Sequence, residues 1–247
     1  MDAGAVWDFL TDPANWTGPQ GMATYLLQQL LLTVTSVVAA AAVGLPVALW
    51  LGHIGRGGAL AINISNVGRA VPTFAVLVLL SLGPLGTDDL GPYGRAGLAT
   101  LVSLLLFALP PIVTNAYVGL REVDREIVEA ARGMGMRGGQ LFRRVELPLA
   151  LPLIITGLRL SVVQVWATAT IAALVAGPGL GNVVTEGFAS SNTPQVVGGA
   201  IVIAAVAVVL ELLMAGLEKA ASPVPTSTGT AGARPETPSA TVQTAQP

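Results

Sequence analysis

Residues 24–51 read TYLLQQLLLTVTSVVAAAAVGLPVALWL, a run of 28 residues without a charged side chain. An α-helix rises about 1.5 Å per residue, so roughly 20 apolar residues cross the hydrocarbon core of a bilayer. This run therefore predicts a membrane-spanning helix. Four further apolar segments follow, at residues 59–82, 96–119, 151–176 and 196–217, with at most one charged residue in each. We predict an all-α membrane protein with about five transmembrane helices.

The composition excludes several other classes of protein. Only 11% of the 247 residues are charged and 53% are hydrophobic, whereas globular domains carry about 25% charged residues. The net charge of −2 argues against a nucleic-acid binder, and the absence of cysteine excludes a disulfide scaffold and thiolate metal sites. His53 is the single histidine, so no paired-histidine zinc motif can form. We expect no metal site and no catalytic residue.

The chain also lacks the motif for nucleotide hydrolysis. A phosphate-binding loop needs Gly-Lys-Ser/Thr after a glycine-rich run. The only lysine, Lys219, lies instead in Leu-Glu-Lys-Ala at the end of an apolar segment. We therefore expect neither a cofactor nor an ATPase site in this chain.

We predict three parts along the chain. Residues 1–21 are polar and carry Trp7 and Trp16, which suits an extracytoplasmic segment at the membrane interface. Residues 22–219 contain the spans and form the membrane domain. Residues 220–247 are rich in Pro, Thr and Ser and predict a disordered cytoplasmic tail. Because the N-terminus lacks the basic region of a secretion signal, we expect the first span to remain in the mature protein.

The distribution of basic residues predicts the orientation, since they concentrate in cytoplasmic loops. The side that carries the loops 52–58 and 120–150 and the C-terminus holds nine of the 12 Lys and Arg residues: Arg56, the six arginines from Arg121 to Arg144, Lys219 and Arg234. The opposite side, with the N-terminus and the loops 83–95 and 177–195, holds only Arg95. We predict that the N-terminus lies outside and the C-terminus in the cytoplasm.

Prolines interrupt most of the predicted spans. Each proline removes a backbone hydrogen bond and kinks a helix, which membranes tolerate where neighbours or a water-lined cavity satisfy the freed carbonyl. Together they favour a bundle that moves or conducts, although membrane helices also simply carry more proline. These residues are Pro46, Pro72, Pro110, Pro111 and Pro152.

Residues 120–150 form the most charged loop of the chain. Glu122 to Arg132 predicts a short polar helix, the glycines 133, 135, 138 and 139 predict interruptions, and Gln140 to Glu146 predicts a second short helix. Two short helices around a glycine turn suit docking of a partner protein. The alternative is a solvated basic loop that only fixes the orientation.

The residues of this loop have a distinctive spacing. Glu129-Ala130-Ala131 is followed after three residues by Gly135, after nine more by Val145, and after one more by Leu147-Pro148. This pattern resembles the EAA signature of permease subunits of bacterial ABC importers, in which Ile stands where this chain has Val145. The resemblance implies a type I, methionine-permease-like core, and a loop that inserts into a cleft of a separate ATPase. It also implies that Glu129 pairs with the ATPase, that Ala130 and Ala131 permit contact, and that Gly135 allows the turn.

Further stretches resemble permeases for osmoprotectants such as glycine betaine, choline, carnitine or proline. They are residues 68–72 (GRAVP), 109–115 (LPPIVTN), 167–173 (ATATIAA) and 177–181 (GPGLG). The resemblance extends over roughly residues 24–217. Methionine importers share the five-helix core and a similar Arg-Ala-Ile-Pro run, so methionine or another amino acid is the alternative solute.

The resemblance implies a permease subunit of an ATP-driven importer in the plasma membrane of a bacterium. A second permease, or a copy of this chain, would complete the translocation path, and the partner ATPase would bind ATP and Mg. An extracytoplasmic solute-binding protein would deliver the solute to the loops 83–95 and 177–195. The candidate residues for translocation or gating are Arg69, Pro72, Pro110, Pro111, Asn115, Arg159 and Glu211.

Two other classes remain open on the sequence. A self-sufficient secondary transporter would use Arg69, Arg159 and Glu211 as ion or proton sites, since charges within spans are functional candidates. A structural membrane subunit would need neither the prolines nor the glycine-rich loop.

The three charges within the spans also predict a contact. An unpaired charge at that depth is unfavourable, so we predict that Glu211 pairs with Arg159 or, as the second choice, with Arg69. The alternative is that each arginine extends to the cytoplasmic interface and Glu211 faces water.

Overall fold

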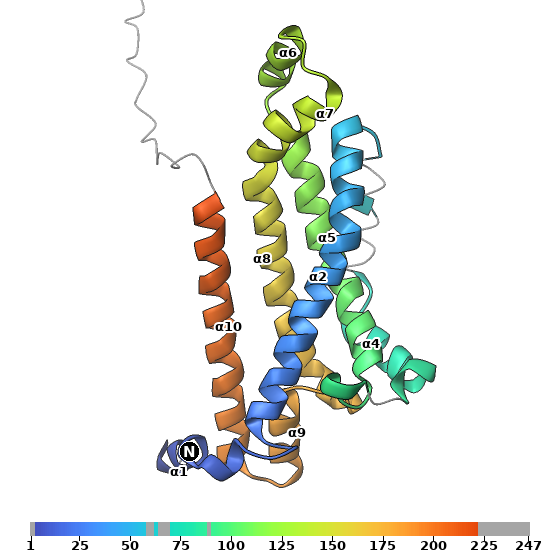
Figure 1. Cartoon of the computed structure of the whole chain (residues 1–247). Coiled ribbons are helices and arrows are strands. Elements are labelled where there is room, and N and C mark those ends of the chain that lie inside the picture. Colours follow the sequence, from blue (N-terminus) through green and yellow to red (C-terminus); the bar gives the residue numbers. More distant parts are fainter. Residues whose placement is uncertain (1–2, 58–61, 64–69, 88–89, 222–247) are drawn as a thin grey trace, which may run out of the picture.

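The computed structural model describes residues 3–57, 62–63, 70–87 and 90–221, and every regular element in these ranges is helical (Figure 1). The long helices are α2 (Met22–Ile54), α5 (Gly97–Arg121), α8 (Leu147–Ile171) and α10 (Thr193–Ala221). The shorter ones are α1 (Ala3–Thr11), α4 (Thr73–Leu82), α6 (Arg125–Gly133), α7 (Gly138–Leu141) and α9 (Gly181–Ala189). A π-helical turn covers Phe142–Glu146, and 3-10 turns cover Pro13–Asn15, Pro84–Gly86, Gly91–Tyr93 and Ala172–Val175.

Four helical segments of the described chain are long and apolar enough to cross a membrane. They are Met22–Ile54, Gly97–Arg121, Gly138–Val175 and Thr193–Ala221, and they coincide with the first, third, fourth and fifth predicted spans. At the second predicted span the structure describes the ten-residue helix α4, while residues 58–61 and 64–69 lie outside the described ranges. The predicted all-α membrane class is confirmed.

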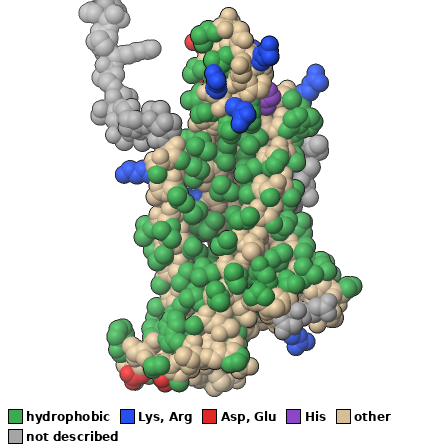
Figure 2. All heavy atoms as spheres, viewed as in Figure 1, with side chains coloured by type: hydrophobic (Ala, Val, Ile, Leu, Met, Phe, Trp, Pro, Cys, Tyr) green, Lys and Arg blue, Asp and Glu red, His purple; other side chains and the backbone are tan. Residues whose placement is uncertain are grey.

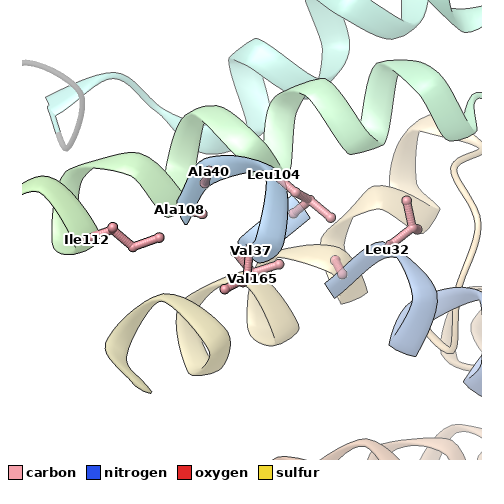
Figure 3. Packing of buried hydrophobic residues seen from close by; sticks show 8 residues of the cluster. Leu32, Val37, Ala40, Leu104, Ala108, Ile112 and Val165 are labelled. Atoms are coloured by element: carbon pink, nitrogen blue, oxygen red, sulfur yellow. The ribbon is translucent and has the colours of Figure 1, made fainter. Parts of the chain in front are cut away.

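Three long helices, α2, α5 and α8, form the centre of the bundle. Their shared apolar cluster consists of Leu32, Val37, Ala40, Leu104, Ala108, Ile112, Val165 and Ala169 (Figure 3). Glycines bring the backbones close: a Cβ built at Gly44 would lie 3.1 Å from side-chain atoms of Leu109 and Val113. A Cβ at Gly157 would lie 2.8 Å from the Cβ of Asn115. Small residues at helix contacts are how membrane helices reach close packing.

Helix α10 stands at the outside of this bundle, next to α8 (Figure 1). Its buried residues are Gly198 and Gly199, both near its N-terminal end. A Cβ at Gly198 would lie 2.5 Å from the ring of Phe9 in α1, and one at Gly199 would lie 2.9 Å from Val183 in α9. The rest of α10 exposes large apolar side chains, including Val208, Leu212 and Leu213. It is therefore packed tightly at one end and exposes an apolar surface along the remainder, as a membrane helix does.

The prolines do not break the long helices, which corrects the prediction of interrupted spans. Pro46 lies inside α2, Pro110 and Pro111 inside α5, and Pro152 inside α8, and each helix is continuous through them. Pro72 instead occupies the N-cap of α4, where a missing backbone N–H leaves no helical bond unmade.

The N-terminal segment folds into the short helix α1 and a 3-10 turn that pack at the end of the bundle opposite α6 (Figure 1). The indole of Trp16 donates a hydrogen bond to the carbonyl of Leu10 at 2.8 Å and packs with Met22 and Trp166. Trp7 is exposed. Its position at the membrane interface stays a prediction, and the predicted tail lies outside the described residues from residue 222 onward.

Candidate functional site

The predicted docking loop projects beyond the bundle at one end of the molecule (Figure 1). Its helix α6 begins after Asp124, whose carboxylate accepts a hydrogen bond from the backbone N–H of Glu126 at 2.9 Å. This N-cap explains why the helix starts at Arg125 and not at Glu122 as predicted. The main contacts of α6 are to α7 and to the π-helical turn, so most of its surface is available to a partner.

The EAA residues divide into an exposed pair and a buried residue. Glu129 and Ala130 are exposed, together with Ile127 and Met134. Ala131 is only 2% exposed, which corrects the prediction that it faces a partner. The exposed surface therefore combines a carboxylate, a small residue and two apolar side chains, whereas Ala131 sets the internal packing of the loop.

Gly135 ends α6 in a left-handed backbone conformation, with φ +82°. The N–H of Gly135 donates to the carbonyl of Arg132 at 2.9 Å, and the N–H of Met136 donates to that of Ala131 at 3.2 Å. These two bonds make a Schellman motif, whose positive-φ position favours glycine. The predicted turn at Gly135 is confirmed. The other three glycines were predicted as interruptions, but Gly133 is the last residue of α6 and residues 138–139 lie in α7.

The loop returns to the membrane through one continuous helical path. The amide N–H of Arg137 donates to Gln140 Oε1 at 3.1 Å at the start of α7, and α7 leads through the π-helical turn into α8. The N–H of Leu147 bonds to the carbonyl of Phe142, five residues back. Pro148 follows in the first turn of α8, where its ring would clash with the carbonyl of Arg144 in a regular α-helix. The π-helical turn relieves this clash, so the Leu-Pro of the motif accounts for the irregular junction beside Val145.

A charged cluster joins α8 to α10. Arg159 Nε donates to Glu211 Oε1 at 2.9 Å, and Arg159 Nη1 donates to Glu218 Oε2 at 2.6 Å. Thr156 Oγ1 donates to Glu218 Oε1 at 2.5 Å. The predicted pairing of Glu211 with Arg159 is confirmed, and Arg69 lies outside the described residues. Glu218 was not predicted as part of this cluster, because it lies one residue beyond the predicted fifth span, although its spacing of seven residues from Glu211 places both on one helix face.

The remaining gating candidates of the described chain lie on α4 and α5. Pro110 and Pro111 are buried in α5, and Asn115 Nδ2 donates to the carbonyl of Pro111 at 2.8 Å. Pro111 and Asn115 lie where α5 packs on Gly157 of α8, and Pro72 lies at the start of α4. Among the described residues no group of three metal-ligating side chains comes together.

A buried glutamine that the sequence analysis missed organises the opposite end of the bundle. Gln29 is fully buried in α2; its Nε2 donates to the carbonyl of Trp166 at 3.2 Å and to Thr170 Oγ1 at 3.0 Å. Its Oε1 accepts a hydrogen bond from the N–H of Leu180 at 2.8 Å. Gln29 therefore fixes the glycine-rich loop 177–181 to α2 and α8. A polar residue in the middle of an apolar run was the available signal.

Next to this loop, an open pocket of about 580 Å³ lies between the N-terminal segment and α9. Its lining includes Glu186, Asn192 and Gln195 as well as residues 14–15 and 17–22. The hydroxyl of Tyr25 donates to Glu186 Oε1 at 2.9 Å, which holds this carboxylate at the pocket. The end of the molecule opposite α6 thus offers a polar, acidic hollow.

The helices and the projecting loop have the type I fold of ABC importer permease subunits. The chain superposes on the methionine ABC transporter MetNI in an inward-facing conformation with a TM-score of 0.67, at 20% identity, over 90% of this chain and 100% of that chain. The TM-score is 0.61 for an amino acid ABC transporter crystallised with histidines, at 23% identity, over 81% and 91% of the two chains. These identities show a common fold alone.

The chain belongs to the family of binding-protein-dependent transport system inner membrane components, which matches residues 40–223. It is 35% identical over 195 residues to the choline transport system permease protein OpuBD of Bacillus subtilis, covering 78% of this chain and 82% of the relative. It is 33% identical over 205 residues to the glycine betaine/carnitine/choline permease OpuCD of the same organism, covering 81% and 86%. The osmoprotectant import permease OsmY of Salmonella typhimurium is 34% identical over 202 residues, covering 81% and 82%. The resemblance inferred from the motifs is confirmed, and the chain is a multi-pass permease subunit of a solute importer.

Proposed function

We propose that this permease imports a compatible solute of the glycine betaine, choline, carnitine or proline class. The observation that carries the proposal is the group of osmoprotectant permeases at 33–35% identity over about four fifths of the chain. The likeness to the methionine transporter and to the amino acid transporter with histidines lies at 20–23% identity and supports the fold only. Aromatic residues make up 5% of the sequence, which is few for a cation–π cage around a quaternary ammonium group. Selectivity between these solutes therefore belongs mainly to the solute-binding protein.

Coupling to ATP runs through the projecting loop in this proposal. The exposed Glu129 and Ala130 of α6 contact the ATPase, and the Schellman turn at Gly135 sets the direction in which the chain leaves α6. Residues 122–124 connect α6 to α5, and α7 continues into α8 without a break in helical structure. Residues 122–124 are a short link to α5, and residues 134–137 are a short link to the helical path through α7 into α8. Displacement of α6 therefore moves the ends of α5 and α8. We propose that these two helices change their relative position at the close contact of Pro111 and Asn115 with Gly157.

We propose that α6 lies in the cytoplasm. Figure 2 shows most Lys and Arg side chains at the α6 end of the molecule. Cytoplasmic loops carry the excess of basic residues, so the N-terminus and α9 lie outside. The pocket beside Glu186 and the loops 83–95 and 177–195 are then available to the solute-binding protein.

ATP and Mg bind the partner ATPase and not this chain. The support is the sequence itself, because the only lysine is Lys219, outside any glycine-rich phosphate loop. A second permease subunit, identical or different, completes the path across the membrane.

Uptake assays test the substrate class. The permease is expressed together with the ATPase, second permease and binding protein that co-purify with it, in cells that lack their own compatible-solute importers. Uptake of labelled choline, glycine betaine, carnitine and proline is compared with uptake of labelled methionine. The proposal expects saturable uptake of at least one of the first four. Uptake of methionine alone would contradict it.

A further inference from the structure

His53, the only histidine of the chain, is bonded to the base of the projecting loop. It lies in the last turn of α2, and Glu146 is the last residue of the π-helical turn. His53 Nδ1 and Glu146 Oε2 lie 2.5 Å apart, across 93 residues of sequence. A carboxylate only accepts hydrogen bonds, so Nδ1–H of the imidazole is the donor.

The surroundings of this bond hold both side chains in place. Glu146 is 6% exposed, and a buried carboxylate needs a partner to be stable. The rings of His53 and Phe142 meet edge to face, with centroids 5.4 Å apart and an interplanar angle of 69°. Phe142 packs in turn against the apolar cluster that includes Ala48, Tyr117 and Ala150. The imidazole therefore sits between α2 and the segment that carries the loop into α8.

This contact gives the loop a third attachment to the bundle. The chain itself attaches the loop to α5 at one end and to α8 at the other. Helix α2 packs mainly on α5 and α8, and among the described residues its polar bond to the loop is the one from His53 to Glu146. The π-helical turn beside it is a rare geometry that often marks functional positions. At this junction a direct bond to α2 adds a constraint that the covalent path alone does not provide.

We propose that His53 and Glu146 are positioning residues that hold the projecting loop against α2. As a result, α2 moves with the start of α8 when the ATPase displaces this loop. This inference rests on the proposed coupling function of the loop. The bond stays closed through the transport cycle. Loss of the bond between His53 and Glu146 uncouples ATP hydrolysis from solute movement. The surfaces that contact the ATPase and the solute-binding protein stay intact.

A double cysteine variant tests this directly, because the natural chain has no cysteine. His53→Cys with Glu146→Cys removes both polar partners together and leaves no buried charge without a counterpart. The complete transporter, with its co-purifying ATPase and binding protein, is reconstituted in proteoliposomes. Solute uptake and ATP hydrolysis are measured before and after linkage of the two cysteines by a short bifunctional thiosulfonate. The single cysteine variants with the same reagent, and Asp8→Ala as an exposed carboxylate change in α1, are the controls.

The expected result is a fall in solute transported per ATP hydrolysed by roughly fivefold or more in the unlinked double variant, within the range of site-to-site coupling. Linking the cysteines restores the ratio toward that of the natural protein. An unchanged ratio in the unlinked variant would overturn the proposal, and so would loss of uptake on linkage, since the two elements would then have to separate. If the double variant does not fold, His53→Asn, whose amide keeps a donor near the position of Nδ1, must retain more coupling than His53→Ala. Absence of ATP-driven uptake by the natural protein contradicts the proposed function and not this inference.

Discussion

Arg159 of α8 and Glu211 of α10 form an ion pair within the membrane-spanning helices, with the guanidinium Nε 2.9 Å from Glu211 Oε1. Glu218 binds the same guanidinium at 2.6 Å. The glycine contacts of α10 lie at its other end, at Gly198 and Gly199. The charged cluster therefore fixes the second half of α10 to α8, where packing is sparse.

Neutralising Arg159 is expected to harm the protein more than neutralising either acid. Arg159→Gln leaves two carboxylates without their cation, whereas Glu211→Gln leaves Arg159 bonded to Glu218. The yield of folded protein after detergent extraction should be lower for Glu211→Gln than for the natural protein, and lower still for Arg159→Gln. The double variant Arg159→Gln/Glu211→Gln should recover part of the loss, and Lys219→Gln, an exposed neighbour, serves as control. Equal yields of all four would show that the cluster does not stabilise α10.

The turn at Gly135 predicts a graded series of variants. An alanine at a left-handed position is disfavoured by about 1–2 kcal/mol, and a β-branched residue by more. Gly135→Ala should reduce ATP-driven uptake, Gly135→Val should abolish it, and Gly135→Asn should retain most of it because asparagine tolerates this conformation. Gly133→Ala is the matched control, since no atom lies within 4 Å of its added Cβ and its φ is not positive. Full uptake by Gly135→Val would refute a role for the turn.

Replacement of two adjacent glutamines in α2 is expected to affect stability differently. Gln29→Leu removes three hydrogen bonds and leaves the N–H of Leu180 without its acceptor, which should lower stability by about 1–3 kcal/mol. Gln28 has an Oε1 that is buried without a hydrogen-bond partner among the described residues, so Gln28→Leu should be nearly neutral. Thermal unfolding of the purified variants in detergent measures both. A similar midpoint for the two variants would argue that Gln29 does not hold the 177–181 loop.

Single cysteines determine the orientation. Because the chain has no cysteine of its own, Glu186→Cys and Arg137→Cys each give one reactive site, and both positions are exposed. In intact cells an impermeant thiol reagent should label the cysteine at position 186 and leave that at position 137 unlabelled until the membrane is opened. The reverse pattern would invert the topology.

Periodic and compositional features were predictable from the sequence. Long apolar runs with at most one charge predicted four of the helices, and the EAA spacing predicted the loop, its turn at Gly135 and the family. The ion pair of Arg159 and Glu211 followed from depth alone, because a charge within a span needs a partner. These signals are local or depend on a simple count.

Contacts between distant helices were not predictable in the same way. The bonds of Gln29 to Trp166 and Leu180 depend on how α2 packs against α8, which no local pattern encodes. Prolines predicted interruptions, yet packing by neighbouring helices keeps α2, α5 and α8 continuous. Ala131 belongs to the motif, but its burial depends on how α6 packs against the rest of the projecting loop.

ATP-driven uptake by the reconstituted transporter tests the central claim most directly. Proteoliposomes that contain the permease, its co-purifying ATPase and a companion permease are loaded with MgATP and given the solute-binding protein with labelled solute. The account predicts uptake that requires both MgATP and the binding protein, and that is lost in Ala130→Trp, whose bulky ring occupies the exposed face of α6, while the variant still inserts into the membrane. Uptake without ATP, driven by an ion gradient and retained in Ala130→Trp, would contradict it.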